Sequence, residues 1–229
     1  MFYYRPEAER GSSRFSWLET RHSFSFGHYY DPQHVGFSTL RVINDDKVAP
    51  AAGFEQHGHR NMEIISYILE GAIEHRDTLG NHFVVPAGDV QRMTAGTGIM
   101  HSEFNHSASK PLRFLQIWIT PNQQNLPPGY EQKSIDQSVS LVPIVTPDGR
   151  EGSLRIHQDI SIYRMQLDAG EEWQLASTAR PTYLHVINGG ASGSGYELRD
   201  GDGLGLHNES IRLKAKGRGL VALWFDLNA

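Results

Sequence analysis

The sequence predicts an all-β protein made of two tandem antiparallel β-barrels with few short helices. Three observations support this fold class: short segments in which apolar and polar side chains alternate, turn residues at short intervals between them, and no amphipathic helical pattern longer than about two turns. The 23 glycines and 11 prolines agree with a chain that turns often. Many short strands joined by Gly- and Pro-containing turns are typical of barrels and sandwiches.

Strand patterns are clearest in the first half of the chain. They combine alternation with β-branched and aromatic residues, which favour a pleated, half-buried surface. The expected strands cover residues 37–43, 63–69, 82–85 and 112–119. The expected turns cover residues 44–46, 70–71, 79–81 and 86–88, where Gly, Pro, Asn and Asp gather.

A polar, proline-rich segment at residues 121–129 separates this half from a second series of strand patterns. The two halves share a pattern of a strand, a glycine, a hairpin and an acidic turn, which indicates an internal duplication of one barrel. We therefore expect a first domain at residues 1–125 and a second at residues 126–229. The expected strands of the second half cover residues 156–167, 181–188 and 220–225.

Composition excludes several classes of protein. The net charge of −5 without a basic run argues against direct nucleic-acid binding, which requires neutralisation of phosphates. The absence of cysteine excludes disulfides, thiolate metal sites and a cysteine nucleophile. The N-terminal residues lack the apolar core of a secretory signal, and no apolar run approaches the ~20 residues that span a bilayer. We expect a cytoplasmic monomer without a membrane partner.

Two pairs of potential metal ligands stand out among the 12 histidines. His57 and His59 are two residues apart, as are His101 and Glu103, and residues two apart on a strand share one face. Glu63 would share the face of the first pair if its strand stayed regular. Three imidazoles and a carboxylate from two strands predict a site for a divalent transition metal: Fe, Mn, Ni, Co, Cu or Zn.

These segments resemble the two motifs of the cupin superfamily, and specifically its pirin family. The first motif is matched by His57, His59, Glu63 and Gly71, and the interval between Glu63 and Gly71 is one residue longer than usual. The second motif is matched by Gly80, Pro86, Gly88, His101 and Asn105. In this motif the interval between Gly88 and His101 is longer than usual. Residues 17–26, 30–32, 37–46 and 94–103 are similar to pirin signatures, and the resemblance is strong over about residues 10–120.

The resemblance implies a bicupin fold and a specific site. The implied metal ligands are His57, His59, His101 and Glu103, which displaces Glu63 from the usual cupin role. The resemblance further implies a quercetin 2,3-dioxygenase activity, which cleaves a small aromatic flavonol with O2 and releases carbon monoxide. In this activity Glu103 would act as the base beside a bound metal ion, for which Fe(II) is favoured. The second barrel lacks the motif, so we interpret its His157, His185 and His207 as core or surface residues.

Two alternative functions remain open from sequence. The protein could be a non-enzymatic, metal-dependent redox sensor or transcription co-regulator, which a metal without a cavity beside it would favour. It could instead be a cupin enzyme for another small molecule, which a pocket lined by Lys and Arg would favour. The neighbours of the predicted ligands could contact a substrate or simply pack; they are Phe54, Asn61, Met62, His106 and Gln116.

Overall fold

The computed structural model describes residues 1–228, so Ala229, at the end of the expected second domain, lies outside the described residues. The chain divides into two compact units, which are described separately. Unit 1 contains residues 1–10, residues 136–155 and the chain from 159 onward; unit 2 contains residues 11–135 and 156–158. The expected domain boundary at residues 125 and 126 stays a prediction.

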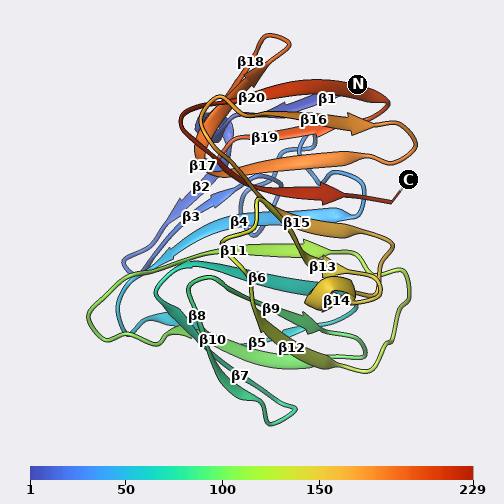
Figure 1. Ribbon diagram of the computed structural model, residues 1–229. Helices are drawn as coiled ribbons and strands as arrows, with labels where there is room; N and C mark the ends of the chain where they lie inside the picture. The colour runs from blue at the N-terminus through green and yellow to red at the C-terminus, as the bar shows by residue number, and fades with distance from the viewer. Residues whose placement is uncertain (229) are drawn as a thin grey trace. The chain divides into compact units, whose positions relative to one another are not determined.

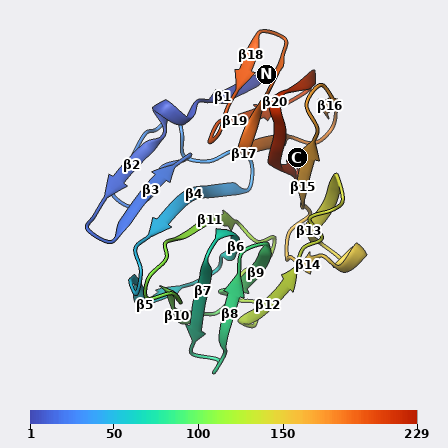
Figure 2. The same cartoon turned by 60° about the vertical axis from the view of Figure 1, so that its left-hand side comes forward.

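Unit 2 contains two antiparallel sheets (Figures 1 and 2). The seven-stranded sheet has the order β12-β9-β6-β11-β4-β3-β2, with β2 Gly11–Arg14, β3 Leu18–His22, β4 Leu40–Val48, β6 Glu63–Glu70, β9 Asp89–Thr94, β11 Leu112–Ile119 and β12 Gly129–Ser134. The four-stranded sheet has the order β5-β10-β7-β8, with β5 Gly53–His59, β7 Ala72–Asp77, β8 His82–Pro86 and β10 Ile99–Asn105.

A shared apolar core joins these two sheets into a β-sandwich. Ile73 and Val85 from the small sheet pack in one cluster with Ile68, Leu112 and Phe114 from the large sheet. Burial of each such side chain contributes about 1.5–3 kcal/mol. Each sheet keeps two edges in its hydrogen-bond order, so the cupin-type barrel takes the form of a sandwich rather than a closed ring of strands.

Strand alternation positions the predicted ligands. Along β10, Ile99, His101, Glu103 and Asn105 are buried while the residues between them are more exposed. The register between β10 and β5 shifts between His101 and Glu103, so that Glu103 pairs with Phe54. Such a bulge re-aims side chains next to a site.

One expected turn is a strand instead. Residues 44–46 lie in β4, between β3 and β11. The polar side chains are accommodated there because they find partners or a cavity: Asn44 and His22 are joined by a hydrogen bond of 2.8 Å, and Arg113 donates two hydrogen bonds to Asp45. Asp46 lines a cavity described below. Pairing with both neighbouring strands overrides the turn propensity of these residues.

Unit 1 is a single nine-stranded sheet around its own core. The main order is β1-β19-β17-β20-β15-β13-β14, with β16 paired to β20 and β18 paired to β17. The strands are β1 Phe2–Arg5, β13 Leu141–Thr146, β14 Leu154–Arg155, β15 Ser161–Leu167, β16 Glu172–Ser177, β17 Thr182–Gly193, β18 Tyr196–Leu198, β19 Gly203–Leu206 and β20 Glu209–Asp226. Within residues 1–228 the helical segments are two 3-10 turns, η1 Glu7–Glu9 and η2 Arg150–Gly152, which confirms the all-β class.

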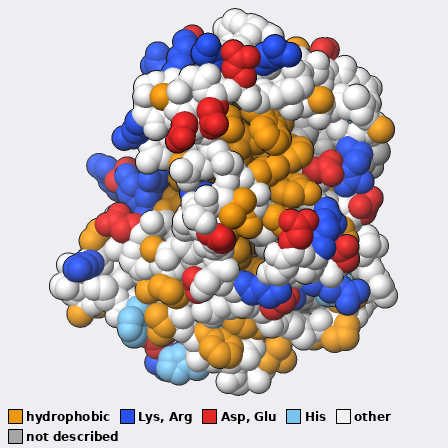
Figure 3. Space-filling model, viewed as in Figure 1, with side chains coloured by type: hydrophobic (Ala, Val, Ile, Leu, Met, Phe, Trp, Pro, Cys, Tyr) orange, Lys and Arg blue, Asp and Glu red, His pale blue; other side chains and the backbone are white. Residues whose placement is uncertain are grey.

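The surface mixes charges of both signs. Basic and acidic side chains are interspersed on the face shown in Figure 3. Exposed pairs include Arg14 with Glu19 at 2.8 Å and Lys216 with Glu197 at 2.7 Å. Pairs of this kind contribute only about 0–1 kcal/mol each, so stability rests on the cores. In the part of the chain that the structure describes, no helix has the length and hydrophobicity needed to cross a membrane.

The core of unit 2 gives a direct stability prediction. Phe114 is fully buried and Phe15 is 54% exposed. We expect Phe114→Ala to lower the free energy of unfolding by about 3–5 kcal/mol, because it removes buried surface and leaves a cavity. The matched substitution Phe15→Ala should change it by less than about 0.5 kcal/mol. Urea unfolding, monitored by tryptophan fluorescence, measures the free energy of unfolding of both variants. Equal losses of this free energy would contradict this description of the core.

Candidate metal centre

Three histidines from two paired strands meet at one point of unit 2. His57 and His59 lie on β5, and His101 on β10 is the direct cross-strand partner of His57. The three ring centroids are 4.5–4.9 Å apart. One nitrogen from each ring lies within 4.8 Å of the others, a spacing at which three imidazoles could hold one metal ion.

The surroundings keep two of these rings, those of His59 and His101, uncharged. Burial, with the proximity of His101 and His57, lowers the pKa of His59 to about 4. Burial, with the proximity of His57 and His75, lowers the pKa of His101 to about 3. A protonated imidazole cannot bind a metal, whereas a neutral ring offers a lone pair. The two rings are therefore in the ligand form at neutral pH.

Unpartnered ring nitrogens test whether a metal fits this site. His101 is 1% exposed, and among the described residues neither of its ring nitrogens has a hydrogen-bond partner. A buried polar atom without a partner is costly, and coordination would satisfy one of these nitrogens. The Nδ1–H of His57 donates to the carbonyl oxygen of Glu55 at 2.7 Å, which leaves Nε2 as its ligating atom. The donor set therefore fits a divalent transition metal.

The carboxylate of Glu103 is held by three polar side chains. Oε1 accepts hydrogen bonds from the Ser66 hydroxyl at 3.1 Å and the Gln91 amide at 2.6 Å, and Oε2 accepts one from the Gln116 amide at 2.9 Å. Hydrogen bonds to a charged acceptor are stronger than those to a neutral one. Glu103 is consequently fixed in orientation beside His101.

Glu63 lies away from the three histidines. Strand β5 ends at His59 and Glu63 begins β6 in the other sheet, so it does not continue the face of the first histidine pair. Its buried carboxylate accepts a hydrogen bond from Thr94 and lies 3.3 Å from Nδ1 of His157. Burial raises the pKa of Glu63, although Arg92 opposes this effect.

Sequence reasoning did not identify His75. It is fully buried on β7, and together with His101 and Glu103 it forms a second group whose potential ligand atoms lie within 4.8 Å of one another. Its Nε2 lies 3.0 Å from the Asp77 carboxylate. The signal that could have found it is the His75-x-Asp77 spacing, which places both side chains on one face of a strand.

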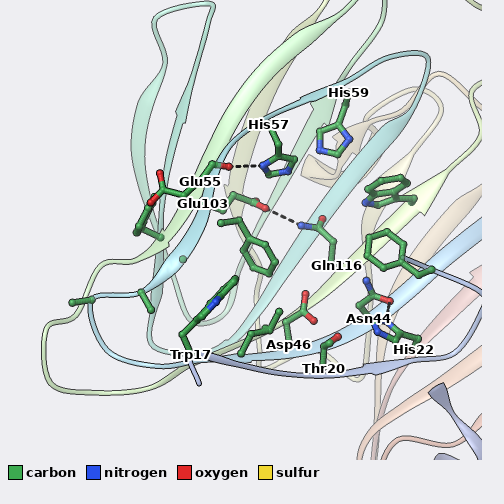
Figure 4. A pocket seen from close by; sticks show the side chains of 18 residues that line it. Trp17, Thr20, His22, Asn44, Asp46, Glu55, His57, His59, Glu103 and Gln116 are labelled. Carbon is green, nitrogen blue, oxygen red and sulfur yellow. Dashed lines mark hydrogen bonds between the residues drawn. The ribbon is translucent and has the colours of Figure 1, made fainter. Parts of the chain in front are cut away.

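A cavity of about 800 Å³ opens beside the histidines, between the two sheets of unit 2 (Figure 4). Its walls contain several aromatic rings: Trp17 packs edge-on against Phe54, with centroids 5.1 Å apart, and Trp118 packs edge-on against His59 at 5.0 Å. Lys and Arg are absent from the described residues that line it. The lining residues are Trp17, Leu18, Thr20, His22, Phe26, Asn44, Asp46, Ala51, Ala52, Gly53, Phe54, Glu55, His57, His59, Glu103, Phe104, Gln116 and Trp118.

Only some of the residues that are close in sequence to the predicted ligands line the cavity. Phe54 and Gln116 line it, as two of the five neighbours singled out from sequence. Asn61, Met62 and His106 are not among its described lining residues, and His106 lies at the surface with its Nδ1 3.3 Å from Glu74. The bulge in β5 explains the position of Phe54, since a regular strand would have turned this ring to the other face.

The histidines of the second half occupy separate positions. His185 is buried in β17 and His207 is exposed in unit 1. His157 belongs to unit 2, where it contacts Glu63. Within the described residues, both groups with metal-ligand spacing lie in unit 2.

Comparison with known families and proteins gives matches over nearly the whole chain. A model described as Pirin matches residues 4–119, and a model described as Quercetinase C-terminal cupin domain matches residues 143–227. These two matches confirm the predicted arrangement of two cupin domains.

Several relatives match at high coverage. Quercetin 2,3-dioxygenase of Escherichia coli K12 is 43% identical, over 99% of both chains. A protein of Pasteurella multocida named as a putative quercetin 2,3-dioxygenase is 40% identical, over 92% of this chain and 93% of the relative. The crystal structure of the bacterial pirin YhhW from Escherichia coli in complex with nickel(II) superposes with a TM-score of 0.95 at 41% identity, over 100% of this chain and 99% of that one.

The geometry of the site predicts how metal binding responds to substitution. We expect one Ni(II) per chain, and His101→Gln should weaken its binding at least about 100-fold because one of a few ligands is lost. The matched substitution of an exposed histidine, His207→Gln, should leave the affinity unchanged. Titration against a competing chelator measures both. Equal affinities in the two variants would rule out His101 as a ligand.

Proposed function

This chain belongs to the pirin family of the cupin superfamily, and we propose that it is a metal-dependent dioxygenase that cleaves a flavonol such as quercetin with O2 and releases carbon monoxide. The observation that carries the proposal is the aromatic-walled cavity beside the histidine group and Glu103. Pockets of about 300–1,000 Å³ with apolar walls and a few convergent polar groups are typical of small-molecule sites. A planar polyaromatic molecule suits the walls formed by Trp17, Phe54 and Trp118.

In the proposed site, His57, His59, His101 and Glu103 hold the metal. A divalent transition metal bound there supplies Lewis acidity, which lowers the pKa of a hydroxyl on the substrate and orients the substrate for reaction with O2. We favour Fe(II) for this role; the chemistry of the ligands also accepts Mn, Ni, Co, Cu or Zn. The nickel complex of the Escherichia coli pirin supports a divalent metal in this family.

Glu103 is the proposed base. It lines the cavity. Among the described residues, its Oε2 accepts one hydrogen bond, from Gln116, whereas Oε1 accepts hydrogen bonds from both Ser66 and Gln91. Oε2 therefore has the greater remaining capacity to take the proton from a substrate hydroxyl. The three donors keep the carboxylate in place while the proton moves.

The walls of the cavity position the substrate and exclude water. Trp17 with Phe54, and Phe26 with Trp118, form edge-to-face pairs with centroids 5.1 and 5.3 Å apart. Rings packed in this way resist rearrangement and offer flat apolar surfaces to an aromatic ligand. Exclusion of water strengthens every charge interaction at the ligand end of the cavity.

The alternatives left open by the sequence make different demands on the site. A redox sensor needs a metal but no adjoining cavity, and a cupin enzyme for an acidic or sugar substrate would place Lys or Arg in the wall. The large, aromatic cavity favours the flavonol dioxygenase over both. We further propose that the protein works as a cytoplasmic monomer on a small aromatic substrate and O2, without nucleic acid or membrane as a partner.

A substitution of Glu103 tests the proposed base. We expect Glu103→Gln to lower kcat for quercetin at least about 100-fold, because the amide keeps the shape of the side chain but cannot accept the proton. Loss of flavonol absorbance under air gives kcat and KM. Metal content and far-UV circular dichroism of the variant show whether the site and the fold are retained.

Glu63→Gln is the matched control, since it changes a second buried carboxylate of unit 2. It should retain metal and reduce kcat less than about threefold. A Glu103→Gln protein that holds its metal and turns over quercetin at the original rate would refute the role of Glu103. A large loss confined to Glu63→Gln would move the base to Glu63.

A further inference from the structure

A row of polar side chains lines the cavity from the sheet opposite the histidines. His57 and His59 belong to the four-stranded sheet, whereas this row belongs to β3 and β4 of the seven-stranded sheet. Thr20 faces Asp46 directly across the two strands, and His22 faces Asn44 in the same way. In Figure 4 these four side chains lie across the cavity from His57 and His59.

The two pairs differ in how their polar atoms are satisfied. His22 and Asn44 are joined to each other by a hydrogen bond of 2.8 Å. Thr20 is 4% exposed, and its hydroxyl has no hydrogen-bond partner among the described residues. A buried hydroxyl without a partner carries a desolvation cost that a bound group would relieve. Thr20 therefore offers a hydroxyl in this wall with which a polar ligand atom could form a hydrogen bond.

Asp46 provides a second polar group beside Thr20 in the cavity wall. It is 4% exposed, lines the cavity, and directs its carboxylate toward the cavity in Figure 4. Its neighbour Asp45 lies on the other face of β4, where Arg113 donates to it. A carboxylate has several acceptor positions, so Asp46 can accept a hydrogen bond from a ligand in addition to its contacts within the protein. In small-molecule pockets, a few polar groups of this kind fix the orientation of the ligand.

We propose that Thr20 and Asp46 form a subsite that binds a phenolic hydroxyl of the substrate at the end remote from His57 and His59. The inference rests on the proposed function and specifies its substrate class: flavonols that carry hydroxyl groups beyond the one that reacts. A phenolic O–H donates to the Asp46 carboxylate, and its oxygen accepts from the Thr20 hydroxyl. A bare ring offers neither hydrogen bond, and a methyl ether, which lacks the O–H, cannot donate to Asp46.

Selectivity of this kind follows from unpaired polar groups. A site built to hydrogen-bond a ligand hydroxyl discriminates strongly against the analogue without it, because burial then leaves protein groups without partners. The same hydrogen bonds fix which end of a planar ligand reaches His57 and His59. Thr20 and Asp46 are accordingly assigned as positioning and specificity residues, at a distance from the reacting atoms.

The test compares two ligands under anaerobic conditions, where no turnover occurs. Quercetin carries hydroxyl groups on both of its outer rings, whereas 3-hydroxyflavone carries only the hydroxyl that reacts. Quenching of tryptophan fluorescence reports binding, since Trp17 and Trp118 line the cavity. We expect the metal-loaded protein to bind quercetin at least about tenfold more tightly than 3-hydroxyflavone.

Three variants locate the source of this preference. Asp46→Asn should reduce the preference for quercetin to less than about threefold, because it weakens the binding of quercetin but not that of 3-hydroxyflavone. Asp45→Asn, the same change on the neighbouring residue, should leave the preference intact. Thr20→Val should also reduce the preference. Because the Thr20 hydroxyl has no partner to lose, this variant should keep the original thermal midpoint, which provides a folded protein even if Asp46→Asn is unstable.

Each contrary outcome has a distinct meaning. The subsite would be overturned if Asp46→Asn and Thr20→Val weakened the binding of quercetin and 3-hydroxyflavone equally, or if they weakened the binding of neither. Absence of binding of both flavonols to the original protein would overturn the proposed function together with the subsite. Selective binding that the variants abolish, without carbon monoxide release from the original protein under air, would uphold the subsite as a phenol-binding site and refute the dioxygenase.

Discussion

Three imidazole rings meet between two paired strands, and two of them, His59 and His101, are held in the neutral form. His57, His59 and His101 lie within 4.8 Å of one another, and burial with mutual repulsion lowers the pKa of His59 and His101 well below neutral. The ring nitrogens of His101 have no hydrogen-bond partner among the described residues, and buried polar atoms without partners are costly. The arrangement persists because strand pairing in the small sheet fixes the backbone on which the rings stand.

The site also ties the two sheets of unit 2 together. Glu103 stands on β10 of the small sheet, while its three donors, Ser66, Gln91 and Gln116, stand on β6, β9 and β11 of the large one. Hydrogen bonds to a charged group contribute about 1.5–3 kcal/mol each, so this carboxylate is a structural link as well as a proposed ligand and base. The cavity lies beside this link, which places the proposed chemistry at a rigid junction between the sheets.

Local spacing predicted the parts of the site that lie on one strand. The pairs at His57 and His59, and at His101 and Glu103, follow from the two-residue period of a strand, and the structure brings the three histidines together. Ser66 and Gln91 could not be predicted in this way, because their roles depend on which strands become neighbours. The Asn and Asp residues around Asp46 predict a turn, and only pairing with β3 and β11 places this residue in a strand.

Carbon monoxide release from quercetin under air by the metal-loaded protein, compared with a His57→Ala/His59→Ala double variant, tests the proposed activity and its site most directly. We expect loss of flavonol absorbance with release of one carbon monoxide per flavonol in the original protein alone. Equal activity in the double variant would contradict the location of the site. A protein that binds its metal stoichiometrically and releases no carbon monoxide with Fe, Mn, Ni, Co or Cu would contradict the proposed activity.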